Sequence, residues 1–201
     1  MFLTEREIEH PKIDAVEHTH CPFASRSNII ESSSPIIDEL NDSCLMEIKR
    51  EFEKLIQSSS FNDIDGFKID IYKEIDRISQ LVLIVNRLLL TINPLIKQQD
   101  VTRDGWRFIV SGSPFFIVVM SSIYPDTHCR HIPYGSTILF QPEHSFHRFI
   151  PRDRRRQIAQ SIRKVFLKQG IDYVSLVETA SEPQKYILPI DVNDGFISWW
   201  D

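Results

Sequence analysis

Residues 106–120 read WRFIVSGSPFFIVVM, and this stretch decides the fold that the sequence predicts. Trp106, Phe108 and Val110 alternate with their neighbours as in a half-buried β-strand. Ser-Gly-Ser-Pro at 111–114 has the composition of a turn. The residues that follow, up to Met120, form a continuous apolar run rich in valine and aromatic side chains, which is typical of a buried strand. The whole stretch therefore predicts a β-hairpin.

Two helices are expected before the hairpin. From Asp42 onward, apolar residues recur at spacings of three and four, and positions 41–43 all offer N-cap side chains. The serines at 58–60 end this first helix. A wider apolar stripe over 74–96 predicts a second and more buried helix, whose last turns are marked by Pro94.

Further strands and one more helix complete the expected fold. The alternating segment 67–72 and the apolar segment 138–140, stopped by Pro142, are strand-like. Residues 154–168 form an amphipathic helix that the glycine two positions later closes, and 186–188 is a candidate last strand. The sequence therefore predicts an α+β fold, with N-terminal helices followed by a mostly antiparallel sheet and a packed C-terminal helix.

Composition excludes several classes of protein. The chain has 201 residues, of which 42% are hydrophobic and 25% charged, so it is neither disordered nor a transmembrane bundle. The longest apolar stretch, 78–92, is too short to span a bilayer, and the acidic first twenty residues do not look like a signal peptide. Three cysteines without framework spacing point to a reducing cytoplasm. We expect a polar segment over 1–19 and one domain over 20–201.

The charge is unevenly distributed along the chain. Residues 1–100 carry 11 basic and 18 acidic side chains, whereas residues 101–201 carry 12 and 10. Half of the basic residues in the second group fall within 152–164. We interpret them as the solvated face of a helix rather than as a phosphate-binding patch, because a chain of net charge −5 repels a polyanion. Nucleic acid and membranes are not expected partners.

Histidine and cysteine gather in short loop segments. The two main clusters are 18–21, His-Thr-His-Cys, and 128–131, His-Cys-Arg-His; a looser one contains His144 and His147. Three interpretations remain open: local hydrogen bonding, a zinc site and a haem site. Neither cluster contains the C-x2-C or H-x3-H element of common zinc sites. Haem needs one axial ligand, an apolar pocket and basic groups, for which the chain offers 13 phenylalanines and arginines such as Arg148.

Several local strings resemble the YqcI/YcgG family over roughly residues 20–200. They are Cys21-Pro22-Phe23-Ala24, Trp106-Arg107-Phe108, Ser111 to Phe116, Tyr124-Pro125 with His128 to His131, Gln141-Pro142 with Ser145-Phe146, Ile162-Arg163, Gly170, Tyr173 and Trp199-Trp200. The family includes small haem proteins that hydroxylate nitrogen, among them an arginine Nω-hydroxylase and a guanidine N-hydroxylase.

The resemblance implies a haem-dependent monooxygenase that hydroxylates a nitrogen of a guanidine-containing molecule such as L-arginine. The haem would be haem b, bound non-covalently, since the chain lacks the C-x2-C-H attachment motif. Its six glycines contain no G-x-G-x-x-G fingerprint, so reducing equivalents must come from an electron donor protein or from peroxide. A second copy of the chain, in a homodimer, is also among the candidate partners.

The resemblance also suggests which residues hold the haem iron. His128 is the leading axial ligand, because it lies in a string resembling the H-x-R element of the family. His131 is the next candidate. Cys21 is the third, since a thiolate favours cleavage of the O–O bond. His20 and His147 are candidates for a second ligand or a distal proton donor.

Other residues would contact the porphyrin or the substrate. Arg130 is expected to pair with a propionate, with Arg107 as a further basic group. Trp106 and Phe116 are core residues that can also form pocket walls. The carboxylate that a guanidinium substrate requires is unassigned, and Glu143 is the nearest to a family string.

Two alternatives of other classes remain open. One is a non-catalytic haem carrier or sensor in which both axial positions are filled by the protein. The other is a zinc-stabilised binding module, which requires the two His/Cys clusters to converge in space.

Overall fold

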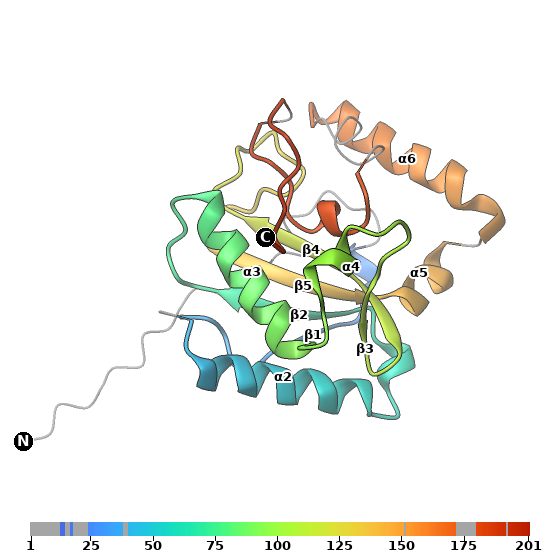
Figure 1. The fold of residues 1–201 in the computed structure, drawn as a ribbon. Helices are drawn as coiled ribbons and strands as arrows, with labels where there is room; N and C mark the ends of the chain where they lie inside the picture. Colours follow the sequence, from blue (N-terminus) through green and yellow to red (C-terminus); the bar gives the residue numbers. More distant parts are fainter. Residues whose placement is uncertain are drawn as a thin grey trace, which may run out of the picture.

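The computed structural model describes residues 13–14, 17, 24–37, 40–150, 152–171, 180–191 and 193–201. Its centre is a five-stranded sheet with the strand order β1-β2-β5-β4-β3 (Figure 1). The strands are β1 (Ile29–Glu31), β2 (Gly66–Ile71), β3 (Phe108–Val110), β4 (Ser113–Ser121) and β5 (Ser136–Pro142). Only β1 and β2 pair in parallel, and all other neighbours are antiparallel. The predicted α+β fold with a mostly antiparallel sheet is confirmed.

The predicted hairpin is β3 and β4, but its turn is shorter than the sequence suggested. Ser111 and Gly112 both have positive φ angles, of 49° and 81°, as the two central residues of a type I′ turn require. Ser113 and Pro114 already pair with β3. A turn of two residues therefore joins β3 directly to β4.

The helices are α2 (Asp42–Ile56), α3 (Ile78–Ile92), α4 (Gln98–Val101), α5 (Glu143–Phe149) and α6 (Arg155–Lys168). Helix α2 begins and ends as predicted, and the side chain of Asn41 caps it by accepting a hydrogen bond from the N–H of Cys44 at 2.8 Å. Helix α3 is shorter at both ends than the predicted 74–96. Its N-terminus is set by Gln80, whose side-chain oxygen accepts hydrogen bonds from the N–H groups of Asp76 and Arg77.

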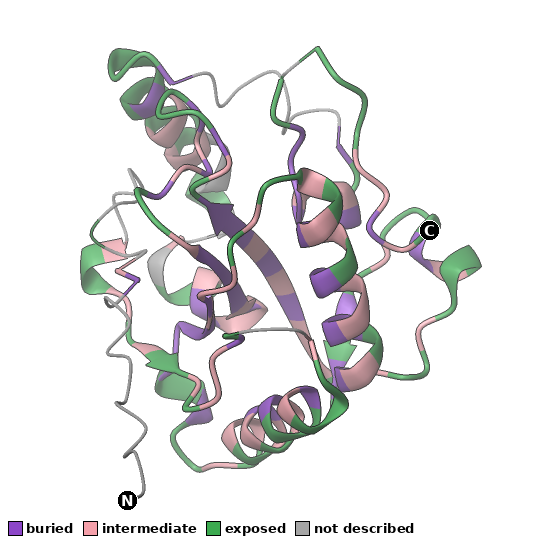
Figure 2. Ribbon diagram, turned by 90° about the vertical axis from the view of Figure 1, so that its left-hand side faces the viewer, coloured by how far each residue is buried: buried purple, intermediate pink, exposed green. Residues whose placement is uncertain are grey.

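One face of the sheet packs against α2 and α3. Phe52 of α2 lies at the centre of this core, with its ring centroid 5.2 Å from that of Phe67, 5.0 Å from Phe115 and 4.9 Å from Phe140. The long strands are buried or half-buried along most of their length, whereas the helices carry exposed residues on their outer sides (Figure 2). Helices α5 and α6 follow β5 at the end of the sheet (Figure 1).

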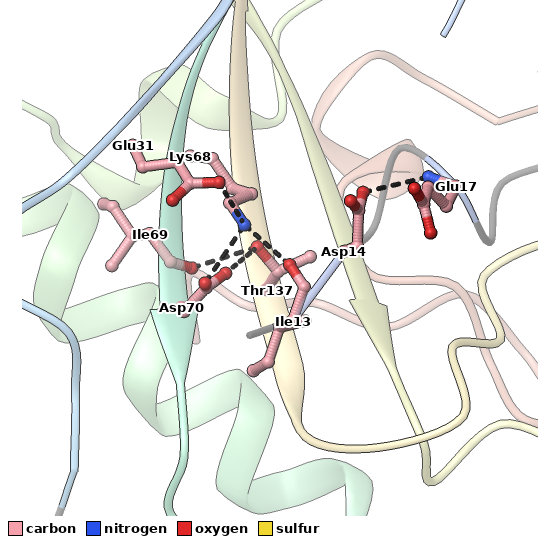
Figure 3. A network of polar contacts seen from close by, with 8 residues as sticks. All are labelled: Ile13, Asp14, Glu17, Glu31, Lys68, Ile69, Asp70 and Thr137. Atoms are coloured by element: carbon pink, nitrogen blue, oxygen red, sulfur yellow. Dashed lines mark hydrogen bonds and ion pairs between the residues drawn. The ribbon is translucent and has the colours of Figure 1, made fainter. Parts of the chain in front are cut away.

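The opposite face of the sheet holds a buried lysine. Lys68 of β2 is 3% exposed, and its Nζ donates to the carbonyl oxygen of Ile13 at 2.6 Å and to Oδ2 of Asp70 at 3.0 Å (Figure 3). Glu31 Oε1 lies 3.1 Å from the same nitrogen. The side chain of Ile13 packs against Met120 and is itself 1% exposed. Part of the polar N-terminal segment is therefore tied to the sheet.

Two further expectations differ from the structure. Strand β5 is longer than 138–140, and Pro142 is its last residue rather than its stop. Residues 186–188 do not form a strand; they follow the 3-10 turn η4 (Pro183–Lys185), and the carbonyl of Tyr186 accepts one hydrogen bond from Val119 of β4. Helix α6 matches its predicted range within one residue, and Gly170, with φ of 74°, closes it. Among the described residues no helix has both the length and the apolar character needed to cross a membrane.

Candidate functional site

A cavity of about 350 Å³ lies where the start of β4 meets α5, α6 and η4. This volume is in the range of pockets that hold small organic molecules. Its apolar walls include Phe115, Phe116, Phe146, Ile150, Ala159 and Ile162. Four charged residues complete the lining: Arg107, Glu143, Glu182 and Lys185.

The junction between β5 and α5 places one wall of the cavity. Because β5 ends at Pro142 and α5 begins at the next residue, Glu143 and Phe146 lie three residues apart on one face of the helix. Ile150 follows directly after the helix and lines the same cavity. The ring of Phe146 packs edge-on against that of Phe116 in β4, with centroids 6.1 Å apart. The two aromatic rings thus fix the distance between helix and strand.

Glu182 is the most embedded charged group of the cavity. Its Oε2 lies 3.9 Å from Nη1 of Arg107 and 3.9 Å from Nζ of Lys185. Both distances exceed hydrogen-bond length, and no described residue donates a hydrogen bond to this carboxylate. Its oxygens therefore retain the capacity to accept hydrogen bonds from a ligand.

The surroundings of Glu182 shift its acidity. Burial raises the pKa of the carboxyl group, the nearby Arg107 and Lys185 lower it, and the negative charge of Glu143 raises it. The sum is a pKa above that of an ordinary glutamate. A carboxylate of this kind gains more than an exposed one from a cationic ligand that restores a full counter-charge.

The cavity therefore combines apolar walls with an equal number of acidic and basic side chains. A ligand that carries one positive and one negative group can pair with both kinds, whereas an ion of a single sign leaves one kind unpaired. The flat aromatic walls suit a planar cation, because guanidinium groups stack on aromatic faces. The arrangement fits a small zwitterion such as a guanidino carboxylic acid.

His128 lies apart from this cavity, in the loop between β4 and β5. It is 5% exposed, and its ring stacks on that of Tyr124 with centroids 4.3 Å apart. Its Nδ1 accepts a hydrogen bond from the N–H of Arg130 at 3.1 Å, so the neutral ring carries its proton on Nε2. Nε2 is buried and makes no hydrogen bond of regular geometry. Because a protonated nitrogen cannot bind a metal, this arrangement favours a structural role of His128 in the loop, and axial ligation by this residue stays a prediction.

Burial lowers the pKa of His128 to about 4, and the positive charge of Arg130 adds to the effect. The unfolded ring takes up a proton near pH 6.5, so the native state should lose about 3 kcal/mol of its free energy of unfolding as the pH falls from 6.5 towards 4. We expect His128→Gln to remove most of this acid sensitivity, measured by urea unfolding at pH 7 and pH 4.5. His147→Gln, at an exposed histidine of α5, should retain it; equal acid sensitivity in both variants would contradict the prediction.

His131 has the opposite hydrogen-bond pattern. Its Nδ1 lies 2.7 Å from the carbonyl oxygen of Tyr124 and must donate, because a carbonyl only accepts. The lone pair of the neutral ring is then on Nε2. Histidines that ligate metals commonly have their second nitrogen bound to a carbonyl in this way. Of the two histidines of this loop, His131 is thus the one whose Nε2 lone pair is available to a metal ion.

Arg130 is a buried cation without a counter-ion among the described residues. It is 6% exposed, its Nη2 donates to the carbonyl of Lys185 at 3.0 Å, and its Nε has no hydrogen-bond partner. A buried guanidinium without a carboxylate is costly, so this site fits a carboxylate brought by a ligand, such as a haem propionate. The bond to Lys185 connects the histidine loop with the edge of the cavity.

The other residues predicted from the sequence lie in the cavity, in a neighbouring cavity or outside the described residues. Phe116 and Arg107 line the cavity, while Trp106 lines a neighbouring cavity of about 380 Å³, to which Arg107 also contributes. Cys21 and His20 lie outside the described residues. Neither His128 nor His131 lines either cavity, and within the part of the chain that the structure describes no three metal-ligating side chains gather in one place.

Sequence analysis did not identify Glu182 and Lys185. They lie in a polar segment without periodicity, 39 and 42 positions after Glu143, and no family string contains them. Glu143 was considered as a substrate carboxylate, and the structure places it in the cavity wall.

Fold and cavity together define an α+β protein with a small pocket of mixed charge beside a five-stranded sheet. Residues 94–176 match the model of the YqcI/YcgG family, which confirms over that segment the resemblance seen in the sequence. The matched residues include β3, β4, β5, α5 and α6, and hence most of the cavity wall. No curated protein and no solved structure matches the chain at a significant level.

Proposed function

We propose that the protein is a haem-dependent monooxygenase that hydroxylates a nitrogen of a small guanidine compound such as L-arginine. The observation that carries the proposal is the cavity at β4, α5 and α6, where two carboxylates and two cations surround aromatic walls. The match of residues 94–176 to the YqcI/YcgG family model supports the reaction type. We place the reaction in the cytoplasm, because the three cysteines lack the spacing of a disulfide framework.

The charged residues of the cavity bind and orient the substrate. Glu182 and Glu143 pair with the guanidinium group, while Arg107 and Lys185, which lie beside Glu182, pair with the carboxylate of the same ligand. The rings of Phe116 and Phe146 hold the guanidinium plane and exclude water. The carboxylate of Glu182 is also positioned to accept the proton that a guanidinium nitrogen loses when it forms a bond to oxygen, and its raised pKa favours that transfer.

Two residues of the loop between β4 and β5 would hold the haem. Nε2 of His131 would bind the iron, and the guanidinium of Arg130 would pair with a propionate. When bound, haem activates O2 or peroxide. With O2, hydroxylation consumes two electrons and two protons, and it forms the N–O bond together with one water; with peroxide, no outside electrons are needed.

The test is a spectroscopic titration of the purified full-length chain with haem, followed by addition of L-arginine. We expect a Soret band, a spectral change on addition of arginine, and an N-hydroxylated product by mass spectrometry when peroxide is supplied. His131→Ala should lose the band, and His128→Ala should keep it. Absence of haem binding contradicts the proposal, and a six-coordinate spectrum that is indifferent to guanidines favours a haem carrier or sensor instead.

A further inference from the structure

Helix α6 concentrates positive charge on an otherwise acidic protein. Residues 152–168 contain seven basic and one acidic side chain, a net charge of +6, whereas the whole chain has a net charge of −5. The helix lies at the periphery of the molecule, beyond α5 (Figure 1). The remainder of the chain is thus strongly acidic, and residues 152–168 are a basic segment of the sequence.

The two sides of α6 have different surroundings. Ala159 and Ile162 line the cavity, and Phe166 is 3% exposed, so this side faces the protein. Lys164 and Lys168 are exposed and, four residues apart, share the outer side. Leu167, which is 55% exposed, adds apolar surface beside them. We name Lys164, Leu167 and Lys168 the outer face of α6.

We propose that the outer face of α6 is the docking surface for a small acidic electron-carrier protein. The inference rests on the proposed function, because hydroxylation with O2 requires two electrons that the chain, without a nicotinamide or flavin fingerprint, must obtain from outside. A carrier bound there lies on the opposite side of the helix from the cavity wall that Ala159 and Ile162 form, so it leaves the cavity free for the substrate.

Charge complementarity favours a small acidic protein as the partner of the outer face of α6. Opposite charges steer two proteins together and suppress wrong partners, and a mixture of lysines with a small apolar area is typical of weak, transient interfaces. A nucleic acid or an anionic membrane presents its negative charge over a long distance and meets the acidic remainder of this chain as well. A small acidic protein contacts the basic face alone.

The experiment uses the full-length protein and an acidic [2Fe–2S] ferredoxin as the probe. The dissociation constant is measured by biolayer interferometry at low and high salt. The affinity should fall as salt is raised, and the double variant Lys164→Glu/Lys168→Glu should weaken it by about 100-fold at low salt, roughly tenfold per reversed charge. The control is Lys54→Glu, an exposed lysine of α2, which should change the affinity by less than about twofold.

A second assay separates this surface from the proposed reaction. Peroxide supplies oxygen and electrons together, so the double variant should hydroxylate arginine at the wild-type rate with peroxide and lose turnover with ferredoxin and O2. If ferredoxin binds in a charge-dependent way but no hydroxylation is detected, the docking surface is supported and the proposed function is wrong. If the double variant binds ferredoxin as tightly as the wild type, the proposed docking surface is wrong and the proposed function is unaffected. The same holds if the wild type binds phosphatidylserine vesicles in a charge-dependent way and does not bind ferredoxin.

Discussion

Replacing Lys68 by methionine is expected to lower the free energy of unfolding by about 3–5 kcal/mol at neutral pH. The side chain of Lys68 is 3% exposed and neutralises Asp70, whose own side chain is 10% exposed (Figure 3). Methionine leaves that carboxylate buried without its counter-charge, and it also removes the donor that holds the carbonyl of Ile13. Urea denaturation followed by tryptophan fluorescence measures the loss.

The pH dependence of this loss has a definite sign. Burial raises the pKa of Asp70 even in the presence of Lys68, so the folded carboxyl group takes up a proton more readily than the unfolded one. The destabilisation by Lys68→Met should therefore be largest at neutral pH and shrink as the pH falls through the raised pKa.

A second substitution provides the control. Lys68→Met/Asp70→Asn removes both charges of this pair, and we expect it to regain part of the lost stability, because the amide still accepts a hydrogen bond from the hydroxyl of Thr137. A single variant as stable as the wild type, or a double variant less stable than the single one, would show that the lysine and the carboxylate are not coupled.

The second large effect concerns ligand binding. We expect Glu182→Gln to weaken the binding of L-arginine by about 100-fold, since truncating one partner of a desolvated charge pair costs roughly 2–5 kcal/mol. Isothermal titration calorimetry of the full-length protein measures the affinity. Glu47→Gln, on the exposed side of α2, removes the same charge from the molecule at a distance and should leave the affinity unchanged.

The affinity should also depend on pH in a way that identifies Glu182. A guanidinium binds the ionised carboxylate, and the pKa of Glu182 is raised. The wild-type affinity should thus decrease as the pH falls through that raised pKa, at a higher pH than for an ordinary glutamate, whereas Glu182→Gln should lack this decrease. Arginine affinity that is equal in both proteins would exclude Glu182 from the binding site.

The spacing of apolar residues along the sequence correctly predicted most of the helices and strands. The apolar spacing from Asp42 to Ile56 identified α2, and the alternation around β2 separated its core residues from Lys68 and Asp70. The ends of α3 were misjudged because they depend on side chains. Gln80 caps the backbone before the helix, and the amide of Asn93, just after its end, donates to the carbonyl of Ile109 in β3.

The segment 186–188 illustrates a different error. Its residues favour a strand by composition, and Tyr186 does approach β4, but one backbone hydrogen bond from Val119 and one from the Tyr186 hydroxyl to the carbonyl of Phe115 do not make a strand ladder. Trp199 stacks on the ring of Tyr186 and its indole N–H donates to the carbonyl of Pro183. Contacts with the C-terminal residues, which no local pattern reveals, hold this segment in an irregular path.

The sequence by itself determined the α+β class, the hairpin and the order of helices and strands, because periodicity and turn composition act over a few neighbouring residues. Only the tertiary structure decided where opposite charges meet and which ring nitrogen of each histidine carries the proton. Glu182 approaches Arg107 through the packing of distant segments, and His131 donates to the carbonyl of Tyr124 because the loop folds back on itself. Such contacts depend on distances in space between residues that are not neighbours in the sequence, and local sequence patterns do not contain those distances.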